Sequence, residues 1–157
     1  MRSVISREKV FRDGRRCLQA GLLAASVFLV SCSVAINKDN VKSSVLAKEI
    51  AAAGGEGPVW AAKGETSVFS LEGKANLLTM FTWPQIDKAG GAHIVEHKWY
   101  TNDTMVSSSK ELAAFGKPPV QVMGSIPTAK LGPGKHRVEL CVGGEFVLAK
   151  EFEIKEK

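Results

Sequence analysis

Alternation of apolar and polar residues with a period of two constrains this chain more than any other feature. In the segment KHRVELCV, residues 135–142, one face would carry Val138, Leu140 and Val142, and the other Arg137, Glu139 and Cys141. This pattern places one face of a β-strand in a core and the other toward solvent. Because similar segments recur from about residue 59 onward, the sequence predicts a sheet protein.

Turn signals divide this region into about seven short strands, roughly 10–15 residues apart. Gly143-Gly144 predicts a two-residue hairpin, and Asn102-Asp103 supplies turn chemistry after a strand. The segment EFVLAKEFEI would place Phe146, Leu148, Phe152 and Ile154 on one face. Without a long helix to connect parallel strands, these segments predict an all-β, antiparallel sandwich.

The C-terminal 65 or so residues resemble the immunoglobulin-like and fibronectin-like modules of bacterial envelope proteins. The resemblance is carried by Trp99-Tyr100, by the stretch from Leu131 to Leu140, and by Phe152-Glu153-Ile154. It implies an immunoglobulin-like sandwich over residues 58–157, but fold resemblance alone does not define a function. The antibody-type cysteine pair is absent, so we expect the core to depend on packing around Trp83 and Trp99.

An apolar run of 11 residues, Ala20 to Val30, lies near the N-terminus behind a basic segment. As a helix it would cover roughly 16 Å, about half of a hydrocarbon core of about 30 Å. A basic region, a short apolar run and a small-residue exit are typical of an export signal. We therefore assign residues 1–31 to a signal peptide; the pair Arg15-Arg16 leaves twin-arginine export open beside the general route.

The exit of this segment, Leu29-Val30-Ser31-Cys32, resembles a bacterial lipobox. The resemblance implies cleavage between Ser31 and Cys32, diacylglycerol on the Cys32 thiol and acylation of the new amino group. Several acyl chains hold a protein firmly in a bilayer, whereas one holds it only marginally. By the same resemblance, Ser33 points to the outer membrane, facing the periplasm or the surface. An ordinary cleaved signal and an uncleaved short anchor remain the alternatives.

Residues 32–57 are interpreted as the lipidated N-terminus and a tether. Val41, Val45, Leu46 and Ile50 follow a near-helical spacing, with Asn40 as a possible cap and Gly54-Gly55 as a possible end. The sequence here predicts a short amphipathic helix or a flexible stalk.

Charge argues against a nucleic-acid partner. The chain carries 21 Lys and Arg against 16 Asp and Glu, a net charge of +5. Six of those basic residues and two of the acidic ones precede Cys32, so the mature chain keeps fifteen against fourteen, or +1. A phosphate backbone calls for a concentrated basic surface. With Cys17 in the signal and Cys32 lipidated, Cys141 has no disulfide partner and is either a packed core residue or an exposed thiol.

No catalytic or metal-binding constellation is apparent. His93 and His97 are four residues apart, which on a strand is roughly 13 Å, too far for two ligands each about 2 Å from one zinc. We therefore expect no cofactor, no metal site and no enzyme activity.

The sequence favours a non-catalytic, lipid-anchored envelope module that contacts a protein partner through an edge strand or the irregular segment 104–119. Within that segment, Phe115 and Lys117 are the candidate contact residues, with Phe115 either an exposed apolar tip or folded back onto the core. The alternative is a periplasmic carrier of a small ligand or metal that uses His93, His97 and His136 from different strands.

Overall fold

The computed structural model describes residues 34–54 and 59–156. The chain divides into two units, residues 1–31 and 32–157. The predicted signal peptide, the Ser31–Cys32 cleavage site and Ser33 lie outside the described residues. Within the described part, no helix is long and apolar enough to cross a membrane.

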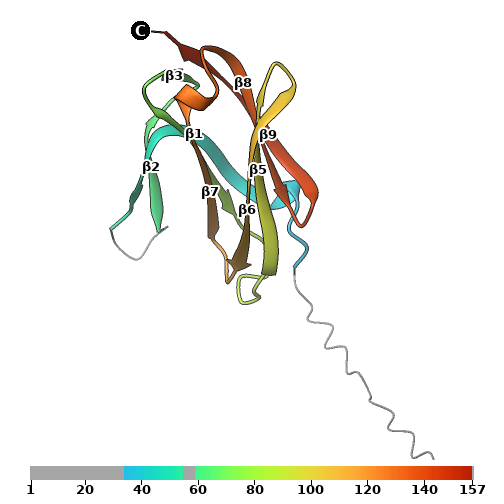
Figure 1. The fold of residues 1–157 in the computed structure, drawn as a ribbon. Coiled ribbons are helices and arrows are strands. Elements are labelled where there is room, and N and C mark those ends of the chain that lie inside the picture. The colour runs from blue at the N-terminus through green and yellow to red at the C-terminus, as the bar shows by residue number, and fades with distance from the viewer. Residues whose placement is uncertain (1–33, 55–58, 157) are drawn as a thin grey trace, which may run out of the picture. The chain divides into compact units, whose positions relative to one another are not determined.

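Strands form nearly all of the regular structure (Figure 1). In chain order the elements are η1 (Lys38–Asn40), β1 (Val41–Ala52), β2 (Trp60–Glu65), β3 (Val68–Ser70), β4 (Lys74–Phe81), β5 (Gly91–Thr101), β6 (Thr104–Phe115), β7 (Val120–Pro127), η2 (Thr128–Lys130), β8 (Gly134–Val142) and β9 (Glu145–Lys155). They build a four-stranded sheet in the order β2-β1-β4-β7 and a five-stranded sheet in the order β3-β9-β8-β5-β6.

The strand order confirms the predicted immunoglobulin-like sandwich. One sheet holds β5, β8 and β9 in antiparallel contact, as the C, F and G strands of an immunoglobulin fold do, and β5 carries a buried Trp at position 99. The opposite sheet pairs β1, β4 and β7. The short β3 adds to β9 in parallel. The described residues contain nine strands, two more than the sequence indicated.

The core lies between the two sheets and is built on aromatic side chains. Trp99 and Phe152 meet edge to face with ring centroids 6.0 Å apart, and Phe152 meets Phe69 in the same way at 5.5 Å. Phe81 packs edge to face on Phe115, also at 5.5 Å. Such aromatic pairs contribute beyond their buried area. Trp83 and Trp99 are both buried, as the sequence predicted.

The helix predicted after Asn40 is wrong, because Val41–Ala52 forms strand β1. This strand pairs with β4 on one side and β2 on the other, and the pairing buries Leu46 and Ala47. The helical element is instead the single turn η1, capped by Asn37. Packing begins earlier still, since Ile36 belongs to the core. The sandwich therefore includes most of the predicted tether and does not begin at residue 58.

The predicted hairpin at Gly143-Gly144 joins β8 to β9, and both glycines have positive φ. The predicted facing of β9 is wrong at its start: Phe146 is exposed and Val147 is buried. A register shift between Leu140 and Cys141 puts the early part of β9 out of phase with its later part, where Phe152 and Ile154 do face the core. One extra residue in a strand reverses the facing of its side chains.

Candidate functional site

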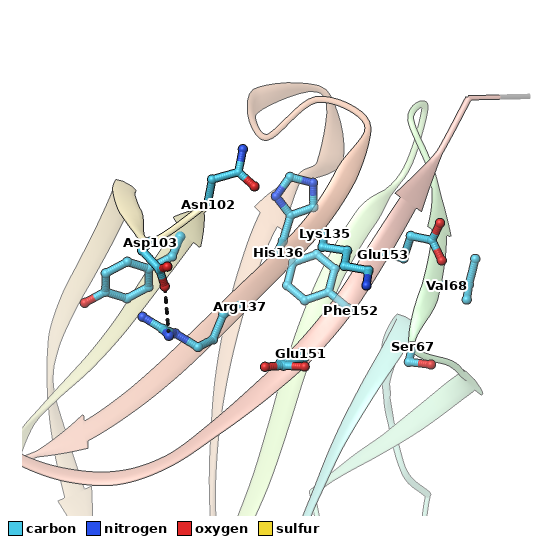
Figure 2. A pocket seen from close by; sticks show the side chains of 11 residues that line it. Ser67, Val68, Asn102, Asp103, Lys135, His136, Arg137, Glu151, Phe152 and Glu153 are labelled. Carbon is cyan, nitrogen blue, oxygen red and sulfur yellow. Dashed lines mark hydrogen bonds and ion pairs between the residues drawn. The ribbon is translucent and has the colours of Figure 1, made fainter.

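A groove of about 340 Å³ lies at one end of the five-stranded sheet (Figure 2). We call this end, marked by the β5–β6 turn and the end of β9, the distal end. The opposite, proximal end holds residues 34–40, the loops 82–90 and 116–119, and the β8–β9 hairpin. The groove is lined by Ser67, Val68, Tyr100, Asn102, Asp103, Lys135, His136, Arg137, Glu151, Phe152 and Glu153.

The β5–β6 turn sets one wall of the groove. Asn102 and Asp103 have φ of 45° and 62°, a left-handed conformation that Asn and Asp tolerate better than other non-glycine residues. The turn closes between the paired residues Thr101 and Thr104. This two-residue reversal brings the Asp103 carboxylate beside Arg137 of β8 (Figure 2).

Arg137 is held from three sides. Its guanidinium carbon lies 4.7 Å from the ring centroid of Tyr100, a separation typical of a cation–π contact. Nη1 donates to Asp103 Oδ1 at 3.3 Å. Nε lies 3.2 Å from Glu139 Oε1, an ion pair whose geometry gives Nε no hydrogen bond within the described residues. These contacts fix the guanidinium in place.

Tyr100 completes this wall. Burial raises the pKa of its phenol, and a hydrogen bond to Glu139 together with the negative charge of Glu139 raises it further. The phenol therefore stays protonated at neutral pH and serves as a platform for Arg137.

His136 and Phe152 form the inner wall of the groove (Figure 2). Both ring nitrogens of His136 have partners: Nδ1 lies 3.0 Å from Thr101 Oγ1 and Nε2 lies 2.9 Å from Gly132 O. The ring also packs on Phe152, with centroids 5.4 Å apart. His136 therefore ties the end of β5 to the loop before β8, and neither nitrogen is left to activate the Ser67 hydroxyl as a base.

The other charged side chains of the groove, Lys135, Glu151 and Glu153, are not in ion pairs within the described residues. Lys135 pairs in register with Glu153, and Arg137 with Glu151, across β8 and β9. Yet within the described residues neither glutamate makes an ion pair, and neither does Lys135. Three carboxylates, counting Asp103, therefore face two cations, of which Arg137 is already held. The groove thus offers two free carboxylates, of Glu151 and Glu153, beside the free ammonium group of Lys135 and the fixed guanidinium of Arg137.

Of the two predicted contact residues, one is buried and the other is exposed. Segment 104–119 is mostly a regular edge strand, β6, and Phe115 at its end is 1 % exposed. Phe115 packs against Phe81 in the core, so of its two predicted placements the core is confirmed and the exposed apolar tip is wrong. Lys117 lies on the exposed loop after β6, where its role as a contact residue stays a prediction.

The three histidines do not gather into one site. His93 Nε2 lies 2.8 Å from Gly90 O, at the proximal end, and its ring packs on Phe115. His97 points into the core, and its Nε2 has no hydrogen-bond partner among the described residues. His136 lies at the distal end, where both of its ring nitrogens have hydrogen-bond partners. The structure also groups no three His, Cys, Asp or Glu residues as metal ligands within 34–54 and 59–156.

Cys141 is buried, in agreement with the packed-residue interpretation and against an exposed thiol. The groove itself was missed by the sequence reasoning, because its members come from β3, β5, the β5–β6 turn, β8 and β9. The Asn-Asp turn and the run Lys135-His136-Arg137 were visible, but only the strand register places them together.

No protein-family model and no curated protein matches this chain. Among solved structures it is similar to an immunoglobulin-like protein from Pseudomonas aeruginosa, with a TM-score of 0.41, 8% identity, and coverage of 60% of this chain and 82% of that one. It is also similar to the alkylpurine DNA glycosylase AlkC of Pseudomonas fluorescens, with a TM-score of 0.39, 20% identity, and coverage of 57% of this chain and 28% of that one. A third similar structure is a β-glucosidase of Listeria innocua, with a TM-score of 0.36, 14% identity, and coverage of 71% of this chain and 16% of that one. The chain thus spans only a small part of the two enzymes, and these likenesses assign no activity.

Proposed function

We propose that this chain is a non-catalytic lipoprotein, anchored through Cys32 in a bacterial outer membrane, whose distal groove binds a protein partner. The observation that carries the proposal is the placement of the groove. The described chain begins at residue 34, two positions after Cys32, and its first residues lie at the proximal end, where Ile36 meets Gly90 and Asn40 bonds to Thr82. The groove lies at the distal end. Strand β5 connects the two ends over roughly 33 Å. An anchored chain would therefore present the groove away from the bilayer.

The groove chemistry favours a partner segment with a lysine or arginine side chain. Glu151 and Glu153 supply free carboxylates, which form short charge-assisted hydrogen bonds with such cations. Asn102 and Ser67 can complete the polar contacts, while Val68 offers a partly exposed apolar surface. Both ring nitrogens of His136 already have hydrogen-bond partners, which supports a binding role over catalysis.

A small ligand remains the second candidate, because a volume of about 340 Å³ lies at the lower end of the usual range for small-molecule sites. A shared histidine–metal site has no support from the described residues, since the three histidines lie at separate places.

The anchor is tested by mass spectrometry of the mature N-terminus. We expect the wild-type protein to begin at Cys32 with acyl chains attached, and Cys32→Ala to lack them. A mature protein that begins elsewhere without lipid would remove the membrane role.

The groove is tested by charge reversal. In a pull-down from detergent-solubilised membranes, Glu151→Lys combined with Glu153→Lys should reduce recovery of a stoichiometric partner at least about tenfold, the effect of 1.4 kcal/mol of lost interaction. The control is Glu111→Lys, an exposed glutamate of β6 near the proximal end. Equal recovery with the groove variant and the control would contradict the assignment of the groove as the contact site.

A further inference from the structure

Four exposed apolar side chains lie at the proximal end, among them the two most exposed large hydrophobic side chains of the described residues. They are Leu112 (76%), Ile86 (71%), Phe146 (57%) and Ile94 (54%). We call these four residues the proximal patch. Scattered apolar residues on a surface need no explanation, whereas a concentration of them marks an interaction site.

Three members of the patch are brought together by the five-stranded sheet. Ile94 and Leu112 are direct cross-strand partners on β5 and β6. Gly143 N donates to Ile94 O at 2.8 Å, which places the β8–β9 hairpin, and Phe146 just after it, beside Ile94. Ile86 lies at the same end, on the loop 82–90 that connects β4 of one sheet to β5 of the other.

The next row of the sheet toward the distal end is charged. Glu96 and Lys110 are cross-strand partners, and Lys98 lies one row beyond. Glu96 makes ion pairs with Lys98 at 3.7 Å and Lys110 at 3.5 Å. The outer face of the sheet therefore changes within two rows from apolar to charged. An apolar rim followed by long lysine side chains suits the boundary between acyl chains and head groups.

The start of the described chain is fixed at this same end. Ile36 is buried in the core, where its side chain, Phe115 and Trp83 enclose Gly90. Asn40 and Thr82 exchange backbone and side-chain hydrogen bonds of 2.8 and 3.4 Å. Two residues of chain can separate the Cα atoms of Cys32 and Val34 by at most about 7 Å. Acyl chains on Cys32 would thus hold the proximal end against the bilayer, with no long tether between.

We infer that the proximal patch inserts into the head-group region of the lipid bilayer and fixes the orientation of the anchored domain, groove outward. The inference rests on the proposed function, since it needs the lipid on Cys32. It extends that function, because the anchor and the patch together make a two-point contact. Apolar side chains at such an interface bury about 5–10 Å into the membrane. The distal groove is then presented to partners in a defined direction.

The test uses the full-length mature protein in vesicles of phosphatidylethanolamine and phosphatidylglycerol, with or without bromine on the acyl chains. Leu112→Trp places a fluorophore in the patch. Met105→Trp is the matched control, because Met105 is 52% exposed on the distal part of the same strand and the same face. Emission from the native Trp60, Trp83 and Trp99 is subtracted with the wild-type protein.

We expect bromine to reduce the added emission of Leu112→Trp about twofold, because a side chain about 5–10 Å into the membrane lies near the brominated acyl chains, and to leave Met105→Trp unchanged. Phe146→Trp, an aromatic exchange at an exposed site, repeats the measurement if Leu112→Trp fails to fold. Mass spectrometry of the same preparation reports the anchor. Lipidated protein in which both patch variants escape quenching overturns the inference alone, and leaves the patch to a protein partner or a second copy. A protein without lipid overturns the inference and the proposed function together.

Discussion

The two faces of β5 place their side chains in opposite environments, one in the core and one toward solvent. The inward face presents Val95, His97 and Trp99, all buried against the other sheet. The outward face presents Ile94, Glu96 and Lys98, which meet only neighbours in their own sheet and solvent. The inward face is therefore specified by packing, and changes there should cost stability. Changes on the outward face should cost little stability and act on binding.

The largest effect is expected at Trp99. Trp99→Ala leaves a cavity beside Phe152 at the centre of the core, which we expect to lower the free energy of unfolding by about 3–5 kcal/mol. Urea denaturation measures the loss. Lys98→Ala, on the opposite face of the same strand, is the control and should leave the midpoint almost unchanged. Similar losses for the two variants would break the distinction between the faces.

The next effect concerns Gly124 of β7, which faces His97 from the opposite sheet. A Cβ at residue 124 would overlap the imidazole ring of His97. We expect Gly124→Ala to cost about 1–3 kcal/mol through overpacking. Gly116→Ala, where a Cβ meets no atom within 4 Å, is the matched control.

The overlap makes the two positions interdependent. In a His97→Ala background the added methyl group has room, so Gly124→Ala should cost much less there than in the wild type. A double-mutant cycle over the four proteins measures the coupling, which reaches about 0.5–3 kcal/mol for residues in contact. Additive losses would show that the ring does not set the limit on residue 124.

The sequence predicted the inward face of β5 and β8 well, because strict alternation and the turn residues Asn102 and Gly143 fix strands and hairpins locally. It misassigned β1, because its apolar residues recur at a spacing of three and four residues, as in a helix, while a register shift between Val41 and Ser43 interrupts the two-residue period of the strand. Pairing of β1 with β2 and β4 decides in favour of the strand, and no local signal reports it.

The sequence left the placement of Phe115 open, misassigned Phe146 and missed the groove for a related reason. The facing of Phe146 depends on a register shift in β8 and β9, and the burial of Phe115 depends on contact with Phe81 from the other sheet. The groove requires four strands and a turn to be aligned at once. Long-range register decides each of these features, whereas periodicity reports only the local environment.

Acid should weaken the protein through His97. Burial lowers the pKa of His97 from 6.5 to about 4 in the folded state, because the core disfavours the charged ring. The unfolded chain therefore binds the extra proton first, and stability present above pH 6.5 is lost as the pH falls toward 4. The loss is roughly 3 kcal/mol, given 1.36 kcal/mol for each pH unit between the two pKa values.

His97→Leu tests this origin. The variant removes the titrating ring and its unpartnered Nε2, so its free energy of unfolding should change less between pH 6.5 and 4 than that of the wild type. At neutral pH it should be about as stable as the wild type, because an unsatisfied buried group is removed. Val95→Ala, a buried change on the same face of β5 that removes no titrating group, is the control and should keep the wild-type slope. An unchanged slope in His97→Leu would place the acid sensitivity elsewhere.

The smallest effect is expected on the outward face, at Glu96. Its carboxylate accepts from Ser108 Oγ at 2.7 Å and makes ion pairs with Lys98 and Lys110. The hydrogen bond from Ser108 is the main cause that lowers the pKa of Glu96, with the two lysines adding to it against the opposing effect of burial. Because such surface pairs are screened by solvent, Glu96→Gln should cost less than about 1 kcal/mol near neutral pH.

The pH range of the effect, and not its sign, distinguishes Glu96 from His97, because both contributions are lost as the pH falls. A carboxyl with a lowered pKa stabilises the fold above its ordinary pKa of 4.5 and loses that contribution as the pH falls through the folded value. The difference between wild type and Glu96→Gln should therefore persist at pH 6, where the loss at His97 has begun, and shrink only below 4.5. It should also shrink in high salt, whereas the cost of Trp99→Ala should not. A salt-independent cost of several kcal/mol at Glu96 would mean that the outward face is packed as tightly as the inward one, and would remove the reason for treating it as a binding surface.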